Sequence, residues 1–117
     1  ADADFEQVIT LTPESADDWR GRGFVLYELG RYEDAVDCYD RALEIKTDDY
    51  DAWRNRGNAL LNLERYEDAV ASFEKALEIK PDDYIALINR GSALFHLEKN
   101  QDAIASFEKA IEIKPDD

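Results

Sequence analysis

Apolar side chains recur along this chain with the period of an α-helix. Between residues 66 and 77 they follow one another at steps of one and three residues, at Tyr66, Ala69, Val70, Phe73, Ala76 and Leu77. These steps place all six on one face of a helix with 3.6 residues per turn, whereas a half-buried strand would alternate every second residue. Residues 50–64 show the same helical spacing. The pattern therefore predicts two consecutive amphipathic helices.

This helix pair recurs along the chain with a 34-residue period. One step of the period leads from Trp19 to Trp53, and the next leads to Leu87. Four further series of residues keep the step: the glycines Gly23, Gly57 and Gly91, two alanine series (Ala35, Ala69, Ala103 and Ala42, Ala76, Ala110), and the aromatic residues Tyr39, Phe73 and Phe107. Three units result, at 16–49, 50–83 and 84–117, with 20 of 34 identical positions between the first two and 23 of 34 between the last two. A fixed period of this length is typical of a solenoid of stacked helix pairs.

Residues 1–15 continue the same register backwards. Phe5 lies one full period before Tyr39, and Pro13 lies one full period before Thr47. We therefore expect residues 1–15 to form the second helix of a preceding unit. The chain then begins inside one unit and ends at a unit boundary, which indicates a segment of a longer array.

Helix ends are marked by capping residues. Residues 80–83 place a proline and two aspartates between consecutive units, where they stop one helix and cap the next. Ser15 begins a Ser-x-x-acid cap before the first unit. Within the first unit Gly30 is suited to a left-handed helix end, whereas Glu64 and Glu98 take its place later. Those two turns are expected either to be strained or to use another geometry.

Small residues predict that the two helices of a unit lie close together. Gly57, Ala69 and Ala76 lack the bulk that would hold the helix axes apart, and large apolar side chains such as Trp53 and Phe73 fill the remaining space. We name the first helix of each unit the A helix and the second the B helix. One pair alone leaves an apolar side uncovered, so stacking of successive units supplies the core.

The repeated pattern resembles the tetratricopeptide repeat. In the second unit the match falls on Trp53, Gly57, Leu60, Ala69, Phe73, Ala76 and Pro81. The sequence departs from the family pattern where Arg22, Arg56 and Arg90 occupy a usual leucine position, where Leu87 replaces the tryptophan and where Thr47 replaces the proline. The resemblance implies an all-α, right-handed superhelix whose A helices line a concave groove. It also implies a non-catalytic scaffold that binds a partner protein or an extended peptide.

Groove positions of the family can be carried over to each A helix. They include Arg20, Phe24 and Tyr27 in the first unit, Arg54, Asn55, Asn58, Leu61 and Asn62 in the second, and Ile85, Ile88, Asn89, Ser92 and Phe95 in the third. This surface is expected to offer polar groups to a peptide backbone or carboxylate and apolar groups to its side chains. The alternative is that Phe24, Tyr27 and Phe95 merely complete the packing between helices.

A narrower possibility is a clamp for the C-terminal carboxylates of heat-shock chaperones. Some tetratricopeptide domains use a basic residue and two asparagines at positions that Arg54, Asn58 and Asn89 occupy here. The other basic residues of such a clamp would fall beyond Asp117, and a buried carboxylate needs more than one cation. This hypothesis is therefore the weaker one.

Charge and composition exclude several other functions. The 28 acidic and 14 basic residues give a net charge of −14, which opposes binding to nucleic acid or an anionic membrane. The A halves of the three units carry −1, 0 and 0 and the B halves −4, −3 and −2, so the excess acidity lies on the B helices and turns. No apolar run is long enough to cross a bilayer.

Candidate chemistry is equally sparse. Cys38 is a lone cysteine that aligns with Ser72, so it predicts a small helix filler, and His96 has no second ligand for a metal. No pairing of nucleophile and base and no phosphate-binding loop occurs, so we expect neither catalysis nor a cofactor. A lone cysteine is compatible with a cytoplasmic location.

A structural role is the competing hypothesis. The B helix of the last unit has no following helix in this sequence, and solenoids usually end on a polar helix. Ala103, Phe107 and Ala110 are therefore expected to form an uncovered apolar face, through which copies of the chain would associate end to end.

Overall fold

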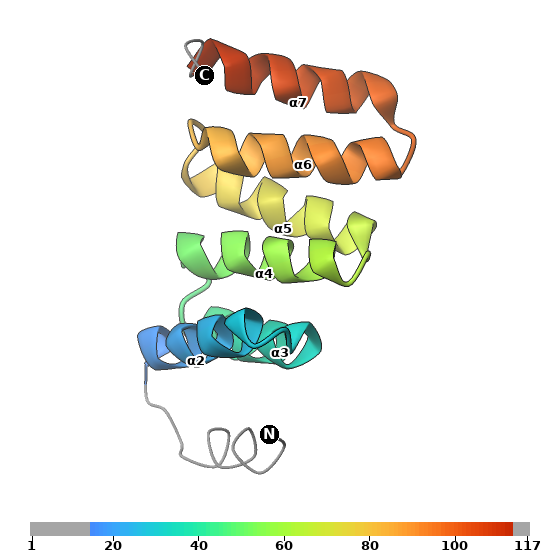
Figure 1. Cartoon of the computed structure of the whole chain (residues 1–117). Helices are drawn as coiled ribbons and strands as arrows, with labels where there is room; N and C mark the ends of the chain where they lie inside the picture. Colours follow the sequence, from blue (N-terminus) through green and yellow to red (C-terminus); the bar gives the residue numbers. More distant parts are fainter. Residues whose placement is uncertain (1–14, 114–117) are drawn as a thin grey trace.

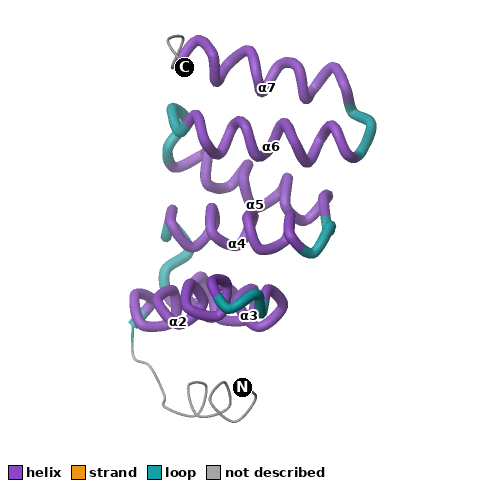
Figure 2. The backbone as a smooth tube through the Cα atoms, in the orientation of Figure 1, coloured by secondary structure: helices purple, strands orange, loops and turns teal. Residues whose placement is uncertain are grey.

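A computed structural model describes residues 15–113, and six α-helices joined by short turns make up this part of the chain (Figures 1 and 2). The helices are α2 (Ala16–Glu28), α3 (Tyr32–Ile45), α4 (Tyr50–Asn62), α5 (Tyr66–Ile79), α6 (Tyr84–His96) and α7 (Asn100–Ile113). The A helices α2, α4 and α6 begin at equivalent positions of the three units, and so do the B helices α3, α5 and α7. The all-α fold predicted from the sequence is confirmed.

The helices are stacked in file. Each packs mainly against the helix before it and the helix after it, and the A helices α2, α4 and α6 also touch one another. Figure 1 shows this as successive layers, from α2 and α3 at one end to α7 at the other. The stack measures 44 × 24 × 24 Å, so it is elongated, as a one-dimensional array of nearest-neighbour contacts requires.

The second helix expected for a preceding unit, residues 1–15, lies outside the described residues except for Ser15. The hydroxyl of Ser15 accepts a hydrogen bond of 3.1 Å from the backbone N–H of Asp18, which caps α2. Asp49 and Asp83 cap α4 and α6 in the same way, with Asp49 accepting from the N–H of Ala52 at 3.2 Å. The capping aspartates predicted at the unit boundaries are thus the second of each pair.

Glycine permits the close approach of the two helices in each unit. A Cβ on Gly23 would lie 2.7 Å from the ring of Tyr39, and a Cβ on Gly57 would lie 2.7 Å from the ring of Phe73. Gly91 has the equivalent relation to Phe107, at 2.8 Å. Only a residue without a side chain fits at these positions, as expected from the repeating glycines.

The turns between A and B helices all use the left-handed conformation. Gly30 has φ 78°, while Glu64 and Glu98 have φ 59° and 62°. The N–H of Arg65 donates back to the carbonyl of Leu60 at 2.9 Å, closing the turn as in the first unit. The backbone at Glu64 and Glu98 is therefore strained and does not use another turn geometry, because a side chain makes the left-handed conformation costly.

The proline at the end of a B helix is not required for its termination. Helix α3 ends at Ile45, and α5 ends at Ile79, the equivalent position of the next unit, although Thr47 stands where that unit has Pro81. In both, the N–H after the last helical residue donates to the carbonyl four residues earlier.

Candidate functional site

The sides of α2, α4 and α6 that carry the predicted groove residues are open to solvent, and we call this surface the A face. Its large apolar side chains are well exposed, with Phe24 at 50%, Ile85 at 45%, Ile88 at 39% and Phe95 at 62%. Phe24 and Phe95 therefore do not complete the packing between helices. The partly exposed members of the A face are Arg20, Tyr27, Arg54, Asn55, Asn58, Leu61, Asn89 and Ser92, and Asn62 is exposed.

Amide side chains connect neighbouring A helices across this face. The Nδ2 of Asn89 on α6 donates to the Oδ1 of Asn58 on α4 at 3.0 Å. The Nδ2 of Asn62 donates to the hydroxyl of Tyr27 on α2 at 3.2 Å and to the carbonyl of Asn58 at 2.9 Å. The structure thus brings Asn58, Asn62 and Asn89 into one hydrogen-bonded row.

Acidic side chains neutralise the two arginines of the A face. The Nη1 of Arg20 lies 2.8 Å from the Oδ2 of Asp49 and 3.0 Å from the Oδ1 of Asp17. Partial burial alone would lower the pKa of Arg20, but the hydrogen bond and charge of Asp49 raise it above its ordinary value. Arg54 lies 3.5 Å from Asp51 and 4.0 Å from Asp83. Neither guanidinium is left as an isolated positive charge for a ligand carboxylate.

A small cavity opens beneath the aromatic end of the A face. It measures about 50 Å³ and is lined by Phe24, Tyr27, Tyr39, Asn55 and Asn58. The hydroxyl of Tyr39 is buried there and has no hydrogen-bond partner within the described residues. Burial raises the pKa of Tyr39, so the phenol stays protonated and keeps its capacity to donate.

His96 belongs to the packing at the far edge of the A face. Its ring stacks on that of Tyr66 with centroids 4.5 Å apart, and its Nδ1 lies 2.8 Å from the carbonyl oxygen of Ser92. No group of three potential metal-ligating side chains occurs within residues 15–113. None of the helices in that range is long and apolar enough to span a membrane.

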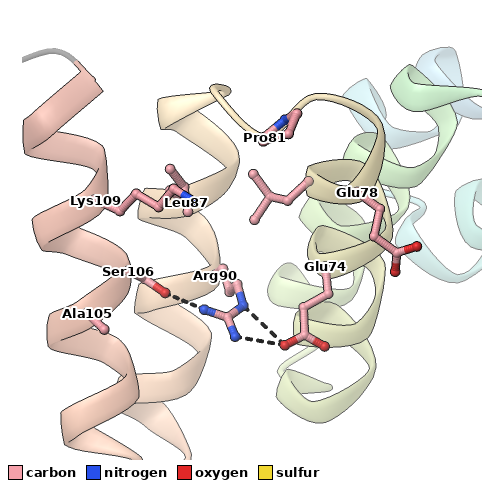
Figure 3. Close-up of a pocket in the computed structure, with 9 residues that line it drawn as sticks. Glu74, Glu78, Pro81, Leu87, Arg90, Ala105, Ser106 and Lys109 are labelled. Carbon is pink, nitrogen blue, oxygen red and sulfur yellow. Dashed lines mark hydrogen bonds and ion pairs between the residues drawn. The ribbon is translucent and has the colours of Figure 1, made fainter.

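Sequence reasoning missed the role of the arginines at the usual leucine position. The Nε of Arg56 donates to Asp40 on the preceding B helix at 2.7 Å, while its Nη1 donates to Ser72 on its own B helix at 2.6 Å. In the next unit Arg90 bonds Glu74 at 2.8 Å and Ser106 at 2.5 Å (Figure 3). The sequence contains this pattern, because Arg56 and Arg90 each have an acidic residue 16 positions before them and a serine 16 positions after them.

The uncovered face expected on the last helix is composed of other residues than those predicted. Ala103 and Ala110 are 2% and 4% exposed and Phe107 is partly buried, because all three face α6 within their own unit. Ile104 and Ile111 are the exposed apolar residues, at 55% and 60%. Within a unit the B helix packs against the A helix through one stripe of residues, and it contacts the next unit through the adjacent stripe. The predicted residues belong to the first stripe, not to the second.

Equivalent positions in the first unit identify that second stripe. Val36 and Leu43 correspond to Ile104 and Ile111 and are only 6% and 7% exposed, since α4 covers them. The contact between units is therefore made by these two positions of the B helix.

The class of the protein follows from this architecture together with its comparisons. A family model described as Tetratricopeptide repeat matches residues 1–50, 25–84 and 54–117. The chain belongs to the tetratricopeptide repeat (TPR) family, whose domains are non-catalytic interaction modules. No curated protein sequence matches the chain at the significance required.

Solved structures with the same fold include peptide complexes. The second TPR of Spaghetti (RPAP3) bound to the HSP90 peptide SRMEEVD is 27% identical, with a TM-score of 0.83, over 86% of this chain and 94% of that chain. The second TPR domain of human RPAP3 in complex with the HSP70 peptide SGPTIEEVD is also 27% identical, with a TM-score of 0.84, over 87% and 85%. YrrB, described as a TPR protein with an unusual peptide-binding site, is 28% identical with a TM-score of 0.87, over 96% of this chain and 58% of that chain.

Proposed function

We propose that the A face binds an extended peptide segment of a partner protein. The observation that carries this proposal is the combination of exposed apolar side chains and hydrogen-bonded asparagines on consecutive A helices. Phe24, Ile85, Ile88 and Phe95 expose large apolar surfaces. Ile85, Ile88 and Phe95 share one side of α6, and exposed apolar groups that gather in this way are typical of interaction sites.

Asparagines suit the recognition of a peptide backbone. Each amide offers both donors and an acceptor, so it pairs with the N–H and C=O groups that an extended chain presents alternately. Asn58 and Asn89 are positioned by their mutual hydrogen bond of 3.0 Å, which reduces the conformational entropy lost on binding. Apolar side chains of the same peptide would then lie over Ile85, Ile88 and Phe95.

The charge distribution favours an uncharged apolar peptide over an acidic chaperone tail. The clamp-like triplet of Arg54, Asn58 and Asn89 is present, but Arg54 already faces Asp51 and Asp83. An incoming carboxylate would have to displace these aspartates or be repelled by them. We therefore expect the peptide SRMEEVD to bind more weakly than an apolar peptide without acidic residues.

A peptide that binds the full chain is first selected from a random peptide display library and then serves as the probe. Isothermal titration calorimetry then compares the selected peptide with SRMEEVD. We expect Asn58→Ala and Phe95→Ser to weaken the selected peptide at least fivefold, and Ile45→Ser, an exposed B-helix control, to leave it unchanged. Unaltered affinity in both A-face variants would remove the assignment of the site.

A second candidate function is self-association through the last helix. Ile104 and Ile111 expose more than half of their surface, whereas the equivalent Val36 and Leu43 are covered by the following unit. We propose that two chains pack these stripes against each other. Sedimentation of the wild-type chain at increasing concentration should reveal a dimer that Ile104→Glu abolishes and Ile45→Glu retains. A monomer at all concentrations would contradict it.

A further inference from the structure

An open pocket of about 480 Å³ lies between α5, α6 and α7, away from the A face (Figure 3). Leu87 and Arg90 contribute to it from α6. At about 100° per residue these two positions lie on the side of α6 opposite to Ile85 and Ser92, which belong to the A face. The pocket is therefore a separate site from the proposed peptide groove.

The pocket occupies the place that a tryptophan ring takes in the previous unit. Trp53 corresponds to Leu87, and its indole N–H donates to the carbonyl of Thr47 at 2.9 Å. Thr47 corresponds to Pro81, which lines this pocket together with Leu77 and Leu87. Leucine is shorter than tryptophan and has no N–H group. The third unit thus keeps the surroundings of the ring while lacking the ring itself.

Cations flank the tryptophan position in every unit. The guanidinium carbon of Arg41 lies 5.3 Å from the ring centroid of Trp19, and that of Arg56 lies 6.0 Å from the ring of Trp53. Lys109 and Arg90 occupy the equivalent positions beside the pocket. Such cations interact favourably with the face of an aromatic ring, and most strongly with an indole.

The two cations of the pocket differ in their contacts. Arg90 is held by Glu74 and Ser106, as the dashed lines in Figure 3 show. Lys109 forms no ion pair within the described residues, and its side chain extends toward Leu87 (Figure 3). Arg90 therefore gives a fixed wall, whereas the ammonium of Lys109 is able to adjust over an entering ring.

We propose that this pocket binds the indole ring of a tryptophan side chain from a partner protein. Leu77 and Leu87 supply apolar contacts, the carbonyl of Pro81 corresponds to the acceptor that Trp53 uses, and Lys109 provides a cation for the ring face. The carboxylates of Glu74 and Glu78 balance the charges of Arg90 and Lys109 at the pocket. This neutral balance favours an uncharged ring over an ion of either sign.

N-acetyl-L-tryptophanamide tests the proposal with the full chain in a ¹H–¹⁵N correlation titration. We expect saturable shifts at the amides of Leu77, Leu87 and Lys109, with a dissociation constant on the order of millimolar for so small a ligand. N-acetyl-L-leucinamide, which has no ring, should bind at least fivefold more weakly. Shifts confined to the A face, or none that saturate, would overturn the assignment.

Two variants separate the pocket from nonspecific binding. Leu87→Trp places the family's ring in the pocket and should abolish the shifts, with the helical fold retained because the second unit carries the same residue. Lys109→Gln should weaken binding about threefold, through loss of the cation over the ring. Lys75→Gln is the matched control, since it alters the same position in a unit whose pocket Trp53 already fills. Equal binding by wild type and Leu87→Trp would contradict the proposal.

Discussion

Gly57 lies against the ring of Phe73 so closely that an added Cβ would come within 2.7 Å of it. Phe73 is fully buried, so its ring has no space into which it could withdraw. The contact sets the distance between α4 and α5, and an equivalent contact recurs in each unit. A substitution at Gly57 therefore tests how closely the two helices of a pair are packed.

Gly57→Ala is expected to lower the free energy of unfolding by about 2 kcal/mol, because the methyl group would force the helices or the ring to shift. Gly21→Ala is the control, since nothing lies within 4 Å of a Cβ at Gly21. That exposed helical position should instead gain about 0.5–1 kcal/mol from the better helix propensity of alanine. Urea denaturation measures both, and a stabilising effect at Gly57 would show that the helices are farther apart than described.

Arg56 links two units through polar contacts on both sides. Arg56→Leu, which restores the residue usual in the family, leaves the fully buried Ser72 without this donor and Asp40 without its cation. We expect a loss of about 1–2 kcal/mol in the free energy of unfolding.

The double variant Arg56→Leu with Ser72→Ala should recover part of that loss, since it removes the buried hydroxyl along with its partner. If Arg56→Leu alone were as stable as the wild type in thermal and urea unfolding, the contacts of Arg56 with Asp40 and Ser72 would contribute nothing to stability.

The left-handed turns allow stabilisation by glycine. Glu64→Gly and Glu98→Gly should each raise the free energy of unfolding by about 0.5–1 kcal/mol, because glycine adopts a positive φ without steric cost. Gly30→Ala should have the opposite effect, of about 1 kcal/mol. Thermal unfolding of the three variants checks the signs, and destabilisation by glycine at both glutamates would refute the strain inferred there.

Cys38 is expected to be unreactive in the folded chain. Burial, with a smaller contribution from the charge of Asp37, raises the pKa of its thiol from 9.0 to about 11. Alkylation by iodoacetamide at pH 8 should therefore be slow in buffer and fast in urea, since the thiolate is the reactive form. Equal rates would show that the thiol is exposed.

The same shift predicts a dependence of stability on pH. The unfolded thiol loses its proton at a lower pH than the folded one, so the free energy of unfolding should fall by about 1 kcal/mol between pH 9 and pH 10. Cys38→Ser, which introduces the residue found at Ser72, should flatten this part of the profile. A slope that persists in the variant would have to arise from other groups.

Much of the fold could be predicted because similar units form the same local structure at equivalent positions. The small residues predicted that the two helices of a unit lie close together, which the contact of Gly57 with Phe73 confirms. The aspartate at the unit boundary was expected to cap the next helix. The exposed pair on the last helix was missed because helical periodicity alone does not tell the stripe that packs within a unit from the stripe that meets the next one. Ile104 and Ile111 became distinguishable only when their burial was compared with that of Val36 and Leu43.

The candidate site was less accessible to sequence reasoning. Positions on the A face followed from the family resemblance, but contacts between distant residues, such as that of Asn58 with Asn89, depend on how the units are stacked. The ion pair of Arg54 on α4 with Asp83, the N-cap residue of α6, likewise joins residues far apart in the sequence. The count of charges along the chain did not indicate that Arg20 and Arg54 are already paired with aspartates.

Binding of a partner peptide to the A face is the central claim, and mapping by ¹H–¹⁵N correlation spectra tests it most directly. With a display-selected peptide at saturation, we predict the largest shifts at Asn58, Asn89 and Phe95 and small ones at the outward residues of α3 and α5. The reverse distribution, with the largest shifts on α3 and α5, would contradict the claim.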